Sequence, residues 1–169
     1  MGNIKQQFNI KQALIDSARS YFNLLDKEVV IQSDQFIEEK IHRLRFFDTN
    51  FLHLTGLKTN LTTKEFFLRC YLGTIAENDY SFGFKNDRNT IKRKLKNLVN
   101  IEFFFKTKIM VQEYFIKNHI SCRIATSDGK CTLGFVDAKY YLRPKTILAN
   151  NHLDMKRSII IISPLIIKK

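Results

Sequence analysis

Few side chains in this sequence combine the types and spacing that chemistry needs, and one such group stands in FLHLTGLK, residues 51–58. His53 lies between two leucines, and Thr55 and Lys58 follow it closely. Histidine titrates near neutral pH and suits proton transfer, lysine neutralises negative charge, and threonine can orient a phosphate oxygen. Two interpretations are open: His53 belongs to a phosphate-handling site, or it is a core histidine hydrogen-bonded at a helix start.

Motifs for metal and nucleotide chemistry are missing from the sequence. It contains no H-E-x-x-H, no paired cysteines, no Walker A loop and no G-x-S-x-G. We therefore expect either binding or a catalysis without cofactor or metal. RNA cleavage is such a reaction, because the 2′-hydroxyl is an internal nucleophile and the protein need supply only an acid, a base and cations.

Positive charge is the main signal in the composition. The chain has 28 Lys and Arg against 16 Asp and Glu, a net charge of +12. Such an excess attracts polyanions, most often nucleic acid. Residues 85–108 hold eight basic and two acidic residues, which is half of the excess. On one interpretation this segment is an ordinary solvated helix face, and on the other it contacts RNA phosphates through Arg88, Lys92, Arg93, Lys94 and Lys96.

From this sequence we expect no segment that directs the protein into or across a membrane. Its most apolar stretch, residues 158–167, contains Pro164 and is too short to span a bilayer. The first twelve residues lack the apolar centre of a secretory signal. Three cysteines without ligand spacing fit a reducing compartment. We expect a cytoplasmic protein that does not bind membranes.

Capping residues predict three helices, which begin after Asn9, near Thr62 and at Asp87. The second ends at Gly73. In the third, the apolar residues point inward and the basic residues mostly outward; the inward set is Ile91, Leu95 and Leu98.

Strand patterns dominate the second half of the chain. Residues 109–117 read as a strand, and alternating runs on both sides of Asp128-Gly129 predict a hairpin with a type I′ turn. Residues 158–167 predict a buried strand interrupted by Pro164. Earlier, residues 27–40 suggest a strand followed by a short helix, and His42 is expected to point outward from a strand.

Helices come early and most of the sheet comes late, which predicts an α+β fold with N-terminal helices packed on a twisted antiparallel sheet. We expect a single domain over residues 1–169, with a helical extension at 1–40 and a nuclease-like core at 41–165.

Three segments together resemble a known family. FLHLTGL at 51–57, LGF at 133–135 and YLRPKTIL at 141–148 are similar to the phage-associated subfamilies of the barnase–EndoU–colicin–RelE nuclease superfamily, above all the fourth. The similarity spans about 41–162. It implies a sheet whose open face holds RNA, and a metal-independent endoribonuclease from a phage or another mobile genetic element, working as a toxin or host-takeover factor.

The resemblance also implies roles for individual residues. His53 would transfer protons, and three threonines would hold the phosphate: Thr55, Thr126 and Thr146. The cationic stabilisers would be Lys130, Arg143 or Lys145, and Lys58 is a further expected RNA contact because it is close to His53 in the sequence. Lys145 departs from the family pattern, in which asparagine usually stands at this place.

A second interpretation is binding without cleavage. The protein would then be an anti-CRISPR inhibitor that acts on the guide RNA, or on the effector–guide complex, of a type II system. Guide RNA, tRNA and mRNA are all possible RNA partners, a host CRISPR effector is a possible protein partner, and the oligomeric state is open. If His53 and Thr146 meet on one open basic face, catalysis is favoured, whereas a buried His53 favours binding.

Overall fold

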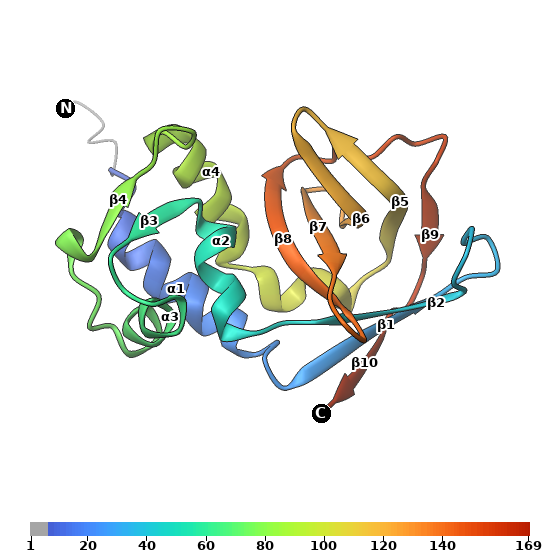
Figure 1. Cartoon of the computed structure of the whole chain (residues 1–169), viewed down its shortest axis with the longest axis horizontal. Coiled ribbons are helices and arrows are strands. Elements are labelled where there is room, and N and C mark those ends of the chain that lie inside the picture. The colour runs from blue at the N-terminus through green and yellow to red at the C-terminus, as the bar shows by residue number, and fades with distance from the viewer. Residues whose placement is uncertain (1–6) are drawn as a thin grey trace, which may run out of the picture.

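Helices and sheet occupy opposite sides of the molecule (Figure 1). The computed structural model describes residues 7–169. The helices are α1 (Ile10–Phe22), α2 (Phe51–Thr55), α3 (Thr63–Leu72) and α4 (Arg88–Leu98). The strands are β1 (Lys27–Gln32), β2 (Ile41–Arg45), β3 (Leu57–Thr59), β4 (Tyr80–Phe82), β5 (Ile109–Lys117), β6 (Ile120–Ser127), β7 (Cys131–Asp137), β8 (Leu142–Ala149), β9 (Ile159–Ile161) and β10 (Leu165–Lys168).

Eight strands form one curled sheet in the order β10-β1-β2-β8-β7-β6-β5-β9, and β3 and β4 form a separate ribbon. Every pair in the large sheet is antiparallel except β2–β8, which is parallel and joined at Leu44 and Leu142. The α+β class with a mostly antiparallel sheet is therefore confirmed.

The C-terminal segment closes the curl of this sheet. We predicted one buried strand interrupted by Pro164, but the chain forms two short strands at opposite ends of the strand order. β9 pairs with β5 and β10 pairs with β1, with only residues 162–164 between them. The two edges of the sheet are thus brought together. The prediction of burial was wrong, because Ile160 and Ile162 are 61% and 77% exposed.

The three predicted helices are present with their predicted caps. Asn9 Oδ1 accepts a hydrogen bond from Gln12 N at 3.0 Å, and Thr62 Oγ1 accepts one from the third residue of α3 at 3.1 Å. Asp87 Oδ1 accepts one from Thr90 N at 2.8 Å. These side chains satisfy amide groups that the first helical turn leaves free.

Residues 7–40 belong to the main core. α1 buries one face against α3 and α4, and its Tyr21 hydroxyl donates to Phe47 O at 2.7 Å. The Tyr21 ring packs among buried phenylalanines, including Phe51 at 5.5 Å between ring centroids. The same stretch supplies β1 to the sheet, and residues 33–40 form turns instead of the predicted short helix.

Two local predictions need correction. The hairpin turn is wider than a type I′ turn, since Ser127 pairs with Thr132 across four intervening residues. Asp128 Oδ1 accepts amide hydrogen bonds from Lys130 and Cys131, so its side chain takes over part of the turn's hydrogen bonding. His42 points inward and is 3% exposed, because it follows the same alternation as the buried Leu44.

Candidate active site

Helix α2 carries the HLTG segment and ends at Gly56, whose φ of +75° lies in the left-handed region. The Thr55 hydroxyl closes this helix: it donates to Leu52 O at 2.7 Å and accepts from Leu57 N at 3.2 Å. Thr55 is fully buried. Its hydroxyl is therefore used to shape α2, and its position gives no support to the predicted role in holding phosphate.

His53 lies on the exposed side of α2. The interpretation as a core histidine is therefore wrong, and within residues 7–169 its ring has no hydrogen-bond partner. His53 lines an open hollow of about 430 Å³ together with Lys58, Phe84 and Lys85. An unpartnered imidazole beside lysines is free to exchange a proton with a bound anion.

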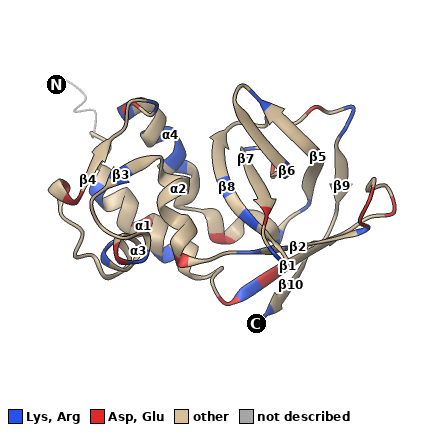
Figure 2. Ribbon diagram, viewed as in Figure 1, with Lys and Arg blue, Asp and Glu red and all other residues tan. Residues whose placement is uncertain are grey.

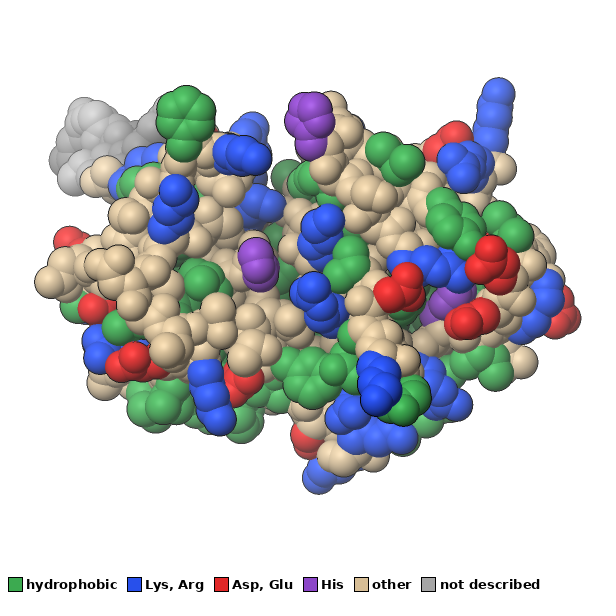
Figure 3. All heavy atoms as spheres, viewed as in Figure 1, with side chains coloured by type: hydrophobic (Ala, Val, Ile, Leu, Met, Phe, Trp, Pro, Cys, Tyr) green, Lys and Arg blue, Asp and Glu red, His purple; other side chains and the backbone are tan. Residues whose placement is uncertain are grey.

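Strand β8, next to α2, carries two of the predicted cations. α2 packs against β8, and Figure 3 shows a histidine side chain over α2 opposite Lys and Arg side chains over β8. These basic residues of β8 are Arg143 and Lys145. Both are exposed or half-buried. The helix of His53 and the strand of Arg143 and Lys145 thus lie side by side, and we call the surface over α2 and β8 the α2–β8 face.

A bulge sets the position of Lys145. Phe135 pairs with Pro144 and Gly134 pairs with Thr146, so Lys145 is the extra residue on its strand. Such a bulge turns a side chain out of the regular alternation. Lys145 Nζ donates to Ser121 O on β6 at 3.2 Å, which holds the ammonium group over the sheet.

Lys94 lies in the interface between α4 and β8 instead of pointing outward as predicted. Its Nζ donates to Ile147 O at 2.8 Å, next to Thr146. Burial lowers the pKa of this lysine to about 8. The side chain also lies under α2, because a Cβ on Gly56 would come within 3.1 Å of Lys94 Cδ. Lys94 therefore joins α4, α2 and β8 beneath the α2–β8 face.

The other two predicted threonines are buried in the sheet. Thr126 is fully buried and its hydroxyl donates to Leu133 O at 3.1 Å. Thr146 is 8% exposed, and its Cγ2 would be 3.1 Å from a Cβ at Gly134. His53 and Thr146 therefore do not meet as two open groups; of the predicted catalytic residues, only His53 is open to solvent.

The remaining predicted cations are spread over other surfaces, in line with the dispersed basic residues in Figure 2. Lys92 and Lys96 lie over the Phe8 ring at 5.6 and 5.9 Å. Arg93 reaches Thr90 at 3.4 Å, and Lys130 shares a different hollow with Lys96. Lys92 and Lys96 thus share the side of α4 next to Phe8, whereas Lys94 faces β8.

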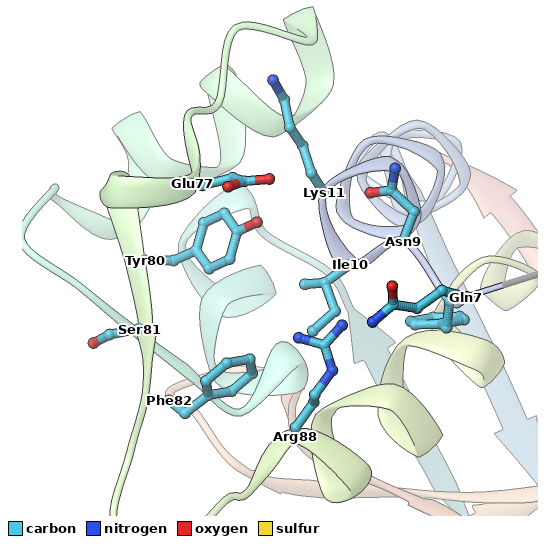
Figure 4. Close-up of a pocket in the computed structure, with 10 residues that line it drawn as sticks. Gln7, Asn9, Ile10, Lys11, Glu77, Tyr80, Ser81, Phe82 and Arg88 are labelled. Atoms are coloured by element: carbon cyan, nitrogen blue, oxygen red, sulfur yellow. The ribbon is translucent and has the colours of Figure 1, made fainter.

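Arg88 lines a hollow of about 560 Å³ between the start of α1 and β4. Figure 4 shows its guanidinium group directed toward Ile10, with the rings of Tyr80 and Phe82 extending from β4 on the other side. This hollow is separate in its lining from the one that contains His53.

Sequence reasoning missed a buried ionic cluster formed by His42, Glu113 and Arg123. Glu113 Oε2 lies 3.9 Å from both His42 Nε2 and Arg123 NH1, and none of these three atoms has a hydrogen-bond partner among the described residues. The other Glu113 oxygen accepts from Ile37 N at 2.8 Å. Tyr114, in the middle of β5, has a φ of +55°, which is strained for a bulky residue.

The described residues include neither a cluster of metal ligands nor a membrane-spanning helix. Within residues 7–169, no three His, Cys, Asp or Glu side chains are grouped so as to hold a metal ion. No helix in this range is long and apolar enough to cross a membrane.

Comparison with known families agrees with the resemblance in the HLTG, LGF and RPKT segments. Residues 13–160 match the family described as phage-Barnase-EndoU-ColicinE5/D-RelE like nuclease4. The chain belongs to this nuclease family. The match begins within α1, well before the expected start near residue 41, and it supports a nuclease-like function. Comparisons with curated proteins and with solved structures gave no match.

Proposed function

We propose that this member of the nuclease family is a metal-independent endoribonuclease that cuts RNA on the α2–β8 face. The observation that carries the proposal is the position of His53, which is exposed and unpartnered among the described residues, on a helix that packs against β8, the strand of Arg143 and Lys145. This set supplies the proton carrier and the cations that cleavage through the 2′-hydroxyl requires.

In the proposed reaction, His53 accepts the proton of the 2′-hydroxyl as its oxygen attacks the adjacent phosphorus. The new 2′-O–P bond forms, the P–O5′ bond breaks, and the 5′ oxygen leaves as a hydroxyl after taking a proton from solvent water. The products are a 2′,3′-cyclic phosphate and a 5′-hydroxyl end. Arg143 and Lys145 stabilise the negative charge that grows on the phosphorus-bound oxygens. The buried Thr55 and Thr126 have no role in this scheme.

The test is incubation of the purified protein with end-labelled structured RNA in EDTA. We expect cleavage with cyclic phosphate ends, and a loss of roughly 10²- to 10⁴-fold in rate for His53→Ala. His119→Ala is the matched control, since His119 is exposed in the β5–β6 turn, outside the lining of the His53 hollow. Equal rates for His53→Ala and the unmodified protein would remove His53 from the mechanism.

A second candidate function is RNA binding without cleavage, as in an anti-CRISPR protein that engages guide RNA. The spread of Arg88, Lys96 and Lys130 over surfaces other than the α2–β8 face favours it, because a long structured RNA or a ribonucleoprotein touches several patches. The same assay separates the two functions when a type II effector with its guide is added. RNA that is bound but stays intact in every arm supports the binding function alone.

A further inference from the structure

Phe84 is a large aromatic residue whose side chain is 100% exposed. It follows β4 and lines the hollow that contains His53. Leu52 and Leu57 supply apolar wall to this hollow, and Lys58 and Lys85 supply positive charge. Among residues 7–169, no acidic side chain lines it. The lining therefore combines an uncovered aromatic ring with cations, which is the chemistry that attracts a nucleotide base and its phosphate.

The loop that carries Phe84 is fixed to the HLTG segment. Asn86 Nδ2 donates to Gly56 O at 3.2 Å, which ties the end of the loop to the end of α2. At the other end, the Lys58 side chain lies across Gly83, where an added Cβ would come within 3.0 Å of Lys58 Cε. Phe84 is thus held beside His53 by contacts at both ends of a short loop.

We infer that this hollow is a subsite for one unpaired RNA base, which stacks on Phe84 while Lys58 and Lys85 bind the flanking phosphates. The inference rests on the proposed function and adds the form of RNA that the site accepts. A base inside a duplex is already stacked on its neighbours and cannot cover Phe84, whereas a base in a loop or single strand can. Stacking on one ring tolerates any base, so the subsite selects unpaired nucleotides with little sequence preference.

The charge of the lining distinguishes this occupant from an apolar protein segment. A protein partner would leave Lys58 and Lys85 in need of acidic residues, while RNA brings a phosphate with every nucleotide. The position beside His53 places the stacked nucleotide next to the group that we propose to transfer the proton.

Binding is measured in a His53→Ala background, so that the result does not depend on cleavage. The probes are a short single-stranded RNA containing 2-aminopurine and a blunt RNA duplex of the same sequence. We expect Phe84→Ala to weaken single-strand binding about tenfold or more and to abolish the stacking-dependent fluorescence change, with little effect on the duplex. Phe84→Tyr retains the ring and restores both signals.

Phe103→Ala is the control, because Phe103 is also exposed, at 51%, but lines a different hollow. Replacing successive bases of the single strand by abasic sites gives a double-mutant cycle. We expect one abasic position to weaken binding to the protein that retains Phe84 and to have no further effect on binding to Phe84→Ala. Unchanged single-strand affinity in Phe84→Ala, or equal losses for single strand and duplex, would overturn the subsite. If the expected binding pattern is found but the protein with His53 does not cleave RNA, the subsite stands and the proposed function is contradicted.

Discussion

At the scale of single residues, availability of polar atoms decides which candidates can act. The sequence and its family resemblance identified His53, Thr55 and Thr126 as chemically suitable. A sequence pattern does not show which acceptor a threonine hydroxyl hydrogen-bonds to. Both of these threonines are fully buried and donate to backbone carbonyls, whereas His53 is open. The histidine was therefore accessible to prediction as a candidate, whereas the loss of the threonines depends on their burial and on the backbone carbonyl that each hydroxyl reaches.

Lys94 gives a prediction with a definite sign. Its folded pKa of about 8 lies below the ordinary value of 10.5 because the side chain is buried, so the unfolded chain holds the proton to higher pH. Relative to Lys94→Met, the unmodified protein should gain roughly 1 to 2 kcal/mol of stability between pH 7.5 and pH 9.5, with some reduction for partial exposure. Urea unfolding of both proteins at the two pH values measures it. A difference that stays constant with pH would show that Lys94 is not desolvated.

At the scale of elements, the short helix α2 depends on Gly56. Besides its left-handed φ of +75°, an added Cβ would lie 3.0 Å from Ile91 Cδ1 and 3.1 Å from Lys94 Cδ. We expect Gly56→Ala to lower the free energy of unfolding by roughly 1 to 3 kcal/mol and to reduce RNA cleavage, since the end of α2 must move.

Gly129→Ala is the matched control for this change. Gly129 also has a positive φ, +93°, but apart from its chain neighbours none of the described residues comes within 4 Å of an added Cβ. The loss of stability in Gly129→Ala should come from the backbone conformation alone, and RNA cleavage should be unchanged. Equal destabilisation by the two substitutions, measured by urea unfolding, would contradict the packing argument for Gly56.

The buried His42 joins β2 to β5 and β6, and it makes the fold sensitive to acid. Burial and then the Arg123 charge lower the pKa of His42 below its ordinary value; the other nearby charges are Glu113, Glu39 and Asp137. Below about pH 6.5, His42 therefore binds a proton in the unfolded chain but not in the folded protein. The free energy of unfolding decreases as the pH is lowered. Urea unfolding should show a smaller loss from pH 7.5 to pH 5.5 for His42→Gln than for the unmodified protein. Identical losses would assign the acid sensitivity to other groups.

The elements differed in how well sequence predicted them. The helices after Asn9, Thr62 and Asp87 and the strand pair around Asp128-Gly129 were predictable, because caps and alternation act over a few residues. The division of the C-terminal segment into β9 and β10 was not, since it depends on pairing with β5 and β1 far away in the chain. The His42–Glu113–Arg123 cluster was missed for the same reason.

At the scale of the whole molecule, the net charge of +12 favours RNA binding, and the number of phosphates that the cations neutralise sets how binding responds to salt. Each phosphate that a cation neutralises in a single strand contributes about −0.7 to the slope of log affinity against log salt. We expect Arg143→Ala and Lys145→Ala each to reduce the magnitude of this slope by about 0.7, the contribution of one phosphate. Lys156→Ala, an exposed change in the loop before β9, should leave the slope nearly unchanged. Slopes that respond equally to all three would mean that binding is not centred on the α2–β8 face.

The most direct test of the central claim uses one oligonucleotide in EDTA: a DNA strand with a single unpaired ribonucleotide, followed under single-turnover conditions. The account predicts one cut, on the 3′ side of that ribonucleotide, leaving a cyclic phosphate. The cut should disappear when the 2′-hydroxyl is replaced by 2′-O-methyl and in the His53→Ala protein. Cleavage of the methylated or all-DNA strand, or no cleavage of the strand that carries the 2′-hydroxyl, would contradict it.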